Sequence, residues 1–138
     1  MLKCLNLGKV VLFLFENGVV VNSEQTIPLL DIALLQGYID SLGKNIVEQM
    51  FALYQQQAQV YLADIEKAQG EDAKESWQEH CHKMKGASAS VGLLQLHKKL
   101  VVLEKTSASQ VEKAELLTQL KEENALALQA FEEWLTAV

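Results

Sequence analysis

The chain has 138 residues, of which 49% are hydrophobic and 22% charged, so it is long enough for one globular domain with a substantial core. Its formal charge of −6 argues against a nucleic-acid partner, because phosphate backbones require a basic protein surface. The sequence has no apolar run of about 18 residues, so we expect no membrane-spanning helix and no direct membrane contact. Two cysteines, Cys4 and Cys81, are too few for a disulfide framework.

Residues 1–27 differ from the rest of the chain and are expected to form an N-terminal arm or linker. The segment "KVVLFLFENGVVV" is rich in strand-forming residues, and Asn17-Gly18 is a strong turn signal because both residues tolerate positive φ. The arm is therefore either a short β-hairpin or irregular. A signal peptide is the weaker interpretation, since no small-residue cleavage site follows the apolar patch.

Residues 28–138 show helical periodicity and are expected to form the main domain. The segment "LLDIALLQGYIDSLG" predicts a short leading helix that ends near Gly43, a typical C-terminal glycine. The next predicted helix ends at Gly70. Its apolar stripe has spacings of three and four residues and consists of Val47, Met50, Phe51, Tyr54, Ala58, Tyr61, Leu62 and Ile65.

Three more helices follow. The first begins near Asp72, and its apolar side is Ala73, Trp77, Cys81, Met84, Ser88 and Val91, with a break at Gly92. The second carries Leu93, Leu96, Leu100 and Leu103 and stops before "TSASQ", a polar turn able to cap the last helix. The last begins near Val111 and carries Leu116, Leu120, Ala127, Phe131, Trp134 and Leu135. The pattern predicts an all-α fold, an antiparallel up-down four-helix bundle with a short leading helix.

Two of the three histidines lie in "EHCHKMKGASASVGLLQL". His80 and His82 are two positions apart, so on a helix their side chains diverge by about 160° and cannot share one metal ion. Helical zinc pairs need a spacing of four, which no pair here has. We therefore expect no metal site in this chain.

The apolar side of the third helix tells which histidine faces solvent. Around the helix axis, at about 100° per residue, the His80 side chain points roughly 55° away from the mean direction of the apolar side chains. The His82 side chain points roughly 145° away from it. His80 is therefore expected at the core boundary, whereas His82 lies near the middle of the outer face. Cys81 is expected to be a small buried hydrophobic residue without a reactive role.

The neighbours of His82 on the outer face suit phosphoryl chemistry. Glycine inside a helix destabilises it by about 1 kcal/mol relative to alanine, so a glycine at position 86 suggests a functional need for a residue without a side chain. Together with Ala89 it leaves bare backbone beside the imidazole, where another protein can approach closely. Lys85 is placed to hold phosphate oxygens, and Lys83 adds positive charge. The histidine nitrogen would then act as the nucleophile.

These residues resemble the signature of histidine-containing phosphotransfer (HPt) domains. The segment "HKMKGASASVGLLQL" contains each element of that signature, namely His82, Lys85, Gly86, Ala87, Ser88, Ser90, Gly92 and Leu96. The chain is especially similar to the C-terminal HPt domains of tripartite hybrid sensor kinases of the anoxic-redox and trimethylamine-N-oxide sensing type. The resemblance extends over about residues 29–138.

The resemblance implies a phosphorelay intermediate, which takes a phosphoryl group from a receiver-domain aspartate and passes it to a response-regulator aspartate. It implies that His82 is the phosphoacceptor, that Lys85 stabilises phosphate and that Gly86 permits close approach. The remaining contact residues would be Gln78, Glu79, Lys83 and Ala89. No cofactor of its own is expected, because the partner receiver would bring Mg²⁺.

The same resemblance implies a phosphohistidine intermediate without autokinase activity. We expect a monomer in the cytoplasm, or at the cytoplasmic face of the inner membrane if the chain is part of a hybrid kinase. A kinase dimerisation domain is disfavoured, because neither a proline soon after His82 nor a nucleotide-binding motif is present. A non-catalytic helical-bundle adaptor stays open as the alternative, since bundles serve many functions.

Overall fold

A computed structural model describes residues 3–6, 10–15, 18–25 and 27–138. Three short strands come first, β1 (Lys3–Asn6), β2 (Val10–Phe15) and β3 (Gly18–Gln25). Five helices follow, α1 (Ile32–Leu42), α2 (Lys44–Gly70), α3 (Lys74–Ser90), α4 (Leu94–Glu104) and α5 (Gln110–Ala137).

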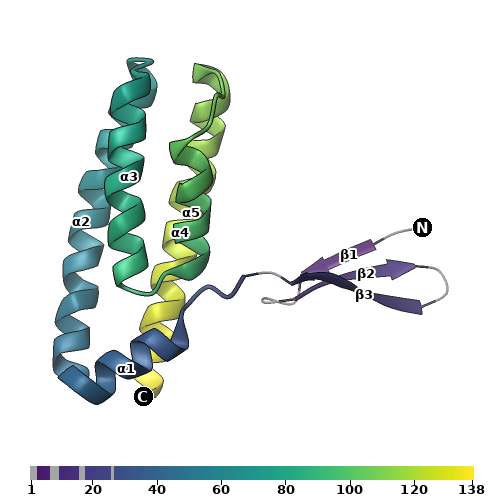
Figure 1. The fold of residues 1–138 in the computed structure, drawn as a ribbon, viewed down its shortest axis with the longest axis vertical. Coiled ribbons are helices and arrows are strands. Elements are labelled where there is room, and N and C mark those ends of the chain that lie inside the picture. The colour runs from purple at the N-terminus through teal and green to yellow at the C-terminus, as the bar shows by residue number, and fades with distance from the viewer. Residues whose placement is uncertain (1–2, 7–9, 16–17, 26) are drawn as a thin grey trace.

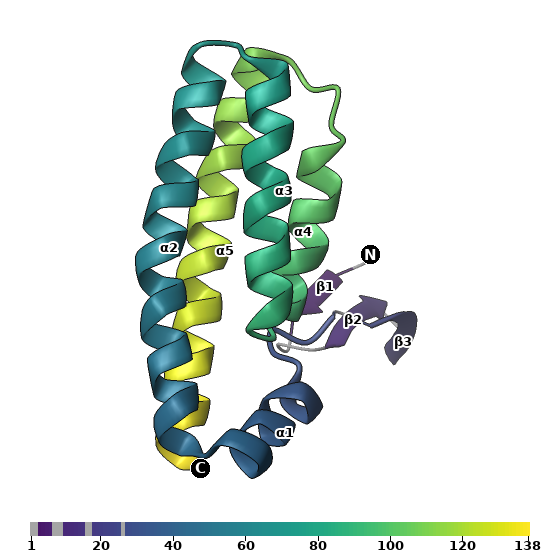
Figure 2. The ribbon, with the colours of Figure 1, turned by 60° about the vertical axis from the view of Figure 1, so that its left-hand side comes forward.

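Helices α2 to α5 form an antiparallel four-helix bundle (Figure 1). Helix α3 packs against α2 and α4, and α5 closes the bundle by packing against the same two helices. Helix α1 lies across one end of the bundle and leads directly into α2 (Figure 2). The predicted all-α bundle with a short leading helix is confirmed. Among the described residues, no helix has both the length and the apolar character that crossing a membrane requires.

The helix ends follow from local sequence signals. Gly43 ends α1 with φ 86°, a left-handed conformation that glycine adopts without strain, and its N–H donates to the Ile39 carbonyl. Ser109, in the predicted polar turn, caps α5 and forms a capping box with Glu112. Helix α3 begins at Lys74 rather than near Asp72, because Asp72 has φ 51° and belongs to the preceding turn.

The predicted apolar stripes form most of the core. On α2, α3 and α4 the predicted positions are buried, except that Met50, Tyr61 and Ala73 are only partly so. The Phe51 and Phe131 rings stack with centroids 4.6 Å apart, which joins α2 to α5. Burial of aromatic and aliphatic side chains of this kind stabilises by about 2 kcal/mol each.

Helix α5 departs from its prediction. Two polar residues, Lys113 and Asn124, are buried, whereas Leu116 and Trp134 are only partly buried. Asn124 accepts a hydrogen bond from the Tyr54 hydroxyl at 3.0 Å, which satisfies both groups in the interior. A pattern built on apolar residues alone does not find such positions.

The N-terminal strands form an antiparallel sheet in the order β1–β2–β3. The expected hairpin is present as β2 and β3, which pair Leu12 with Val21 and Phe15 with Gly18. Its expected turn residue Asn17 lies outside the described residues. Strand β1 was not predicted, because its residues, KCLN, do not alternate between apolar and polar. The sheet lies beside the bundle rather than within it (Figure 1).

Gly92 joins α3 to α4 in a conformation that excludes larger residues. Its φ is 73°, and a Cβ atom there would lie 3.1 Å from Leu35 Cγ. Its carbonyl accepts from the Asp31 N–H at 2.8 Å, which ties the start of α1 to this turn. We expect Gly92→Ala to lower the free energy of unfolding by about 2 kcal/mol, through backbone strain and overpacking.

Urea denaturation measures that change. Gly37→Ala is the matched control, because a Cβ at Gly37 meets nothing within 4 Å and the helix itself prefers alanine. Equal urea midpoints for the two variants would show that the junction tolerates a side chain.

Candidate functional site

His82 stands on the outer face of α3, near the middle of the helix. Its side chain is 67% exposed, whereas its helix neighbours Cys81 and Met84 are fully buried. The helical phase explains the difference, since the core side of α3 is fixed by Trp77, Cys81, Met84 and Ser88. The imidazole is therefore accessible to a macromolecular partner.

One ring nitrogen of His82 is held by a carboxylate from the neighbouring helix. His82 Nδ1 lies 2.6 Å from Glu104 Oε1 at the end of α4. An ionised carboxylate only accepts hydrogen bonds, so Nδ1 carries the proton and donates. In the neutral ring, Nε2 is then left with its lone pair. The arrangement fixes the tautomer in which Nε2 carries the lone pair.

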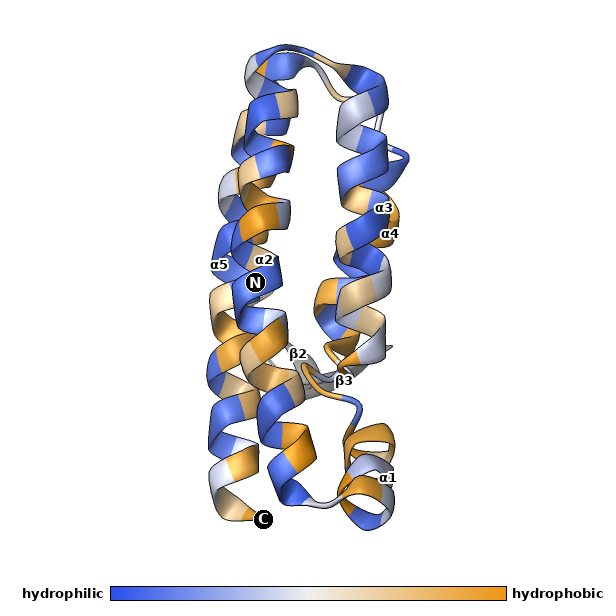
Figure 3. Ribbon diagram, turned by 90° about the vertical axis from the view of Figure 1, so that its left-hand side faces the viewer, coloured by the Kyte–Doolittle hydropathy of each residue, from blue (hydrophilic) through white to orange (hydrophobic). Residues whose placement is uncertain are grey.

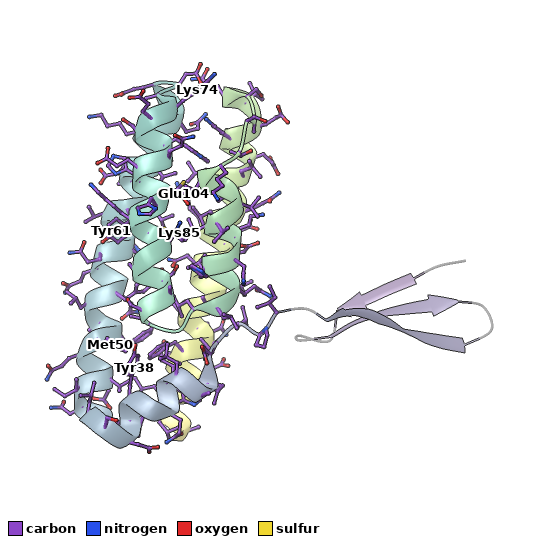
Figure 4. The ribbon with its side chains drawn as sticks, in the orientation of Figure 1. Tyr38, Met50, Tyr61, Lys74, Lys85 and Glu104 are labelled. Atoms are coloured by element: carbon purple, nitrogen blue, oxygen red, sulfur yellow. The ribbon has the colours of Figure 1, made fainter. Side chains whose placement is uncertain are left out.

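Lys85 shares the same carboxylate. Its Nζ donates to Glu104 Oε2 at 2.7 Å, so Glu104 bridges the imidazole and the ammonium group. Figure 4 shows Lys85 and Glu104 midway along the bundle, where α3 and α4 run side by side. The hydrogen bond from Lys85, followed in importance by that from His82, holds the pKa of Glu104 below its ordinary value despite partial desolvation.

Small residues lie beside the imidazole on α3. Gly86 and Ala89 are both exposed, and a Cβ atom at Gly86 would meet nothing within 4 Å. The Gly86 position is therefore open to solvent, and packing inside the chain gives no reason for its glycine. An open glycine one turn from His82 allows the backbone of another protein to come close.

The other predicted contact residues are exposed on the same helix. Glu79 and Lys83 form an ion pair at 3.2 Å, of the kind spaced four residues apart on a helix. Gln78 is exposed, but among the described residues it makes no hydrogen bond to His82. The hydrogen-bond partner of the His82 ring is Glu104.

The remaining histidines and the cysteine take structural positions. His80 is 23% exposed, with Nδ1 3.7 Å from Asp64 Oδ2, as expected for a residue at the core boundary. His97 Nδ1 lies 3.3 Å from the Lys85 carbonyl oxygen. Burial raises the pKa of the Cys81 thiol to about 12, so it is a poor nucleophile. Within the described part of the chain, no group of three His, Cys, Asp or Glu residues could hold a metal ion.

Glu104 is the residue that sequence reasoning missed. It lies 22 residues after His82, on a different helix, and the sequence around it, "VVLEKTS", shows only a helix end. Its contact with His82 and Lys85 depends on how α3 and α4 are rotated against each other. No spacing rule within one helix reports that rotation.

The bridge by Glu104 predicts a pH-dependent contribution to stability. Because its pKa is lowered in the folded state, the stabilisation is complete above the ordinary carboxyl value of 4.5 and is lost as the pH falls through the lower, folded value. We expect Glu104→Gln to lower the free energy of unfolding by roughly 1 kcal/mol at pH 7 and by less at about pH 3, which is below the ordinary carboxyl value.

Denaturant unfolding at both pH values measures this contribution. Glu122→Gln, at an exposed position of α5, controls for the loss of one negative charge. If the parent and Glu104→Gln differ equally at both pH values, the carboxylate bridge does not contribute to stability as argued.

A helical bundle that presents an exposed imidazole from the middle of one helix is the arrangement expected of a histidine phosphotransfer module. Comparisons with known proteins agree. The family model for the Hpt domain matches residues 49–135, more than half of the chain. The chain therefore belongs to the Hpt domain family and is a phosphorelay intermediate of two-component signalling, with receiver domains as its kind of partner.

Solved structures show the same fold. The HPt domain of ArcB from Escherichia coli is 25% identical with a TM-score of 0.70, and the match covers 79% of this chain and 94% of that domain. HptB from Pseudomonas aeruginosa PAO1 is 17% identical with a TM-score of 0.69, over 80% and 97% of the two chains. MtHPt2 from Medicago truncatula is 22% identical with a TM-score of 0.66, over 79% and 78%. No curated protein sequence matches the chain.

Proposed function

We propose that His82 is the phosphoacceptor and that Nε2 is the reacting atom. The observation that carries this proposal is the exposed imidazole whose Nδ1 lies 2.6 Å from Glu104. His80 and His97 are less suitable, because the first is near the core and the second is only partly exposed. Nucleophilic attack requires both access and a free lone pair, and His82 supplies both.

The proposed step moves a phosphoryl group from an aspartyl phosphate of a receiver. The Nε2 lone pair attacks phosphorus, the N–P bond forms, and the P–O bond to the aspartate breaks so that the aspartate leaves as a carboxylate. The ring then carries a proton on Nδ1 and the phosphoryl group on Nε2. Glu104 faces the positive charge that develops on this ring and stabilises it. The reverse sequence delivers the group to a response-regulator aspartate, with Mg²⁺ held by the receiver.

The receiver is proposed to dock over the small residues of α3. Gly86 and Ala89 would lie under the partner, and Gln78, Glu79 and Lys83 would form the surrounding contacts. All five are exposed on the same helix as His82. Close approach matters because phosphoryl transfer depends on in-line placement of the donor, the phosphorus and the acceptor.

Lys85 is proposed to exchange its partner during transfer. It is paired with Glu104 in the resting site, at 2.7 Å, and it lies one helical turn from His82. When a phosphoryl group is on Nε2, the ammonium group has a second set of anionic oxygens within the reach of its flexible side chain. Lys85 would then hold those oxygens while Glu104 keeps the ring oriented.

This role predicts that Lys85→Ala slows transfer roughly tenfold or shortens the phosphohistidine lifetime to a similar degree, since a charge-assisted contact is lost. Rapid-quench measurement with a phosphorylated receiver reports the rate, and decay of the isolated phosphoprotein reports the lifetime. Lys121→Ala is the control, because Lys121 pairs with Glu66 on the exposed surface of other helices, outside the proposed receiver contacts. Unchanged values for both quantities in Lys85→Ala would remove the assigned role.

The wider setting is also proposed. We place the chain with the HPt domains of anoxic-redox or trimethylamine-N-oxide type hybrid sensor kinases, with residues 1–27 as an arm and residues 28–138 as the phosphotransfer domain. In that setting it acts as a monomer in the cytoplasm or at the cytoplasmic face of the inner membrane. The structural likeness to the ArcB domain supports this placement.

A single assay tests the proposed function. A receiver labelled on its aspartate is mixed with the chain, and we expect label on the chain in an acid-labile, base-stable bond at His82. Peptide mapping locates the label. Stable label elsewhere, or none from any receiver tested, would favour the alternative of a non-catalytic adaptor bundle.

A further inference from the structure

A second polar site, which shares Gln78 with the proposed receiver contacts, lies near the end of the bundle where α3 begins and the loop from α4 to α5 runs. A cavity of about 290 Å³ is lined by Lys74, Gln78, Lys105, Thr106, Ser107, Ala108 and Lys113. Three of its seven lining residues are lysines, and none is acidic. Figure 3 shows that this end of the bundle is mostly hydrophilic, in contrast to the end that α1 covers.

Lys113 is the unusual member of this set. It is only 5% exposed, and its Nζ lies 5.1 Å from the centroid of the Trp77 ring. Among the described residues, no carboxylate forms a salt bridge with Lys113. Taking most of a lysine side chain out of water without a paired anion is costly, and a contact with one aromatic ring offsets only part of that cost.

The two other lysines surround the cavity from exposed positions. Lys74 opens α3, whose first turn has no side-chain cap, so free backbone N–H groups and the positive end of the helix dipole add to the local field. Lys105 follows the last residue of α4. Figure 4 shows Lys74 near this end of the bundle, well separated from Lys85 and Glu104.

The carboxyl end of α4 cannot balance these charges by itself. A helix terminus carries about half an elementary charge, whereas the three ammonium groups carry three full ones. Glu104 is nearby in sequence, but its two oxygens are engaged by His82 and Lys85. The lining residues of the cavity therefore have a surplus of positive charge that a small anion would neutralise, and the nearby Glu75 in the first turn of α3 offsets only one of the three charges.

We propose that this cavity binds a phosphate dianion, either as inorganic phosphate or as the phosphate group of a small phosphomonoester. A tetrahedral dianion matches three ammonium groups from different directions, and the hydroxyls of Thr106 and Ser107 add donors. The volume leaves room for water or a small organic group. Because Lys113 forms the buried floor, a small anion reaches it more readily than a flat protein surface does. The proposal does not depend on phosphotransfer at His82.

Nuclear magnetic resonance titration of the full chain tests this proposal. Inorganic phosphate and glycerol 3-phosphate are added separately, with sodium chloride at equal ionic strength as the reference. We expect saturable shifts of the amides of residues 74–78 and 105–113. Saturable shifts with either probe support the site, and the probe that binds more tightly identifies whether free phosphate or a phosphomonoester is preferred. Absence of saturable shifts with both probes overturns the proposal.

Variants assign the binding to the cavity. Lys113→Met retains the aliphatic length and should weaken binding at least about tenfold, since one charge-assisted contact is lost. The double variant Lys74→Gln/Lys105→Gln changes only exposed residues and should weaken binding without affecting the core. Lys121→Met, at an exposed lysine paired with Glu66, is the control and should bind like the parent.

Two results with these variants would overturn the assignment. One is equal binding by the parent, Lys113→Met and the double variant. The other is loss of receiver binding in Lys113→Met when neither small anion binds the parent, which would identify an acidic group of the receiver as the occupant instead.

Discussion

Replacement of His82 by glutamine is expected to abolish phosphoryl acceptance from a phosphorylated receiver. Glutamine has no nucleophilic ring nitrogen, so the N–P bond cannot form, and labelling should fall by at least about a thousandfold. The fold should persist, because the His82 side chain is 67% exposed and packs little. Loss of the hydrogen bond to Glu104 should lower the free energy of unfolding by no more than about 1 kcal/mol, as for other exposed pairs.

Two histidine variants serve as controls for that result. His80→Gln and His97→Gln remove imidazoles from the same region, one next to Asp64 and one next to the Lys85 carbonyl. Both should accept label, with small losses of stability because both histidines are partly buried. If His82→Gln accepts label as well as the parent, another residue is the acceptor and the proposed chemistry is wrong.

Gly86→Glu is expected to slow transfer by at least about tenfold without unfolding the protein. A Cβ atom at Gly86 meets nothing within 4 Å, so the longer side chain extends outward into the space proposed for the receiver. Misplacement of reacting groups by about 1 Å can cost a hundredfold in rate. Stability should be equal or up to about 1 kcal/mol higher, because glycine is a poor helix former.

Two control variants separate steric obstruction of the receiver from the effects of added charge and of glycine replacement. Gly70→Glu adds the same side chain and charge at the end of α2, where a Cβ also meets nothing within 4 Å. It should transfer at the parental rate. Gly86→Gln tests bulk without charge and should also be slow. Normal transfer by Gly86→Glu would show that the bare surface beside His82 has no role in docking.

Most of the helical architecture was predictable from the sequence. Apolar residues three and four positions apart identify the buried faces of α2, α3 and α4, because each turn contains 3.6 residues. Gly43 and Ser109 mark helix boundaries, since one permits positive φ and the other caps free N–H groups. The outward direction of His82 follows from the same helical phase.

The predictions were weakest for polar residues in the interior. Asn124 is buried because Tyr54, on another helix, supplies a hydrogen-bond donor at 3.0 Å. Lys113 is buried over the Trp77 ring, 5.1 Å from its centroid. Asparagine and lysine are mostly exposed in folded proteins, so residue type alone does not predict their burial. Their burial depends on partners that lie far away in the sequence.

The sequence alone determined the class of fold, because apolar periodicity identifies the helices and their buried faces. It also determined the exposed position of His82 and the absence of a side chain at Gly86, because both are properties of a single helix. Only the tertiary structure decided which carboxylate reaches the imidazole and where the lysines converge. Glu104 meets His82 and Lys85, and Lys113 meets Lys74 and Lys105 at one cavity, through the packing of different helices. Such contacts depend on the rotation and axial offset of packed helices, which are set by the whole core rather than by local spacing.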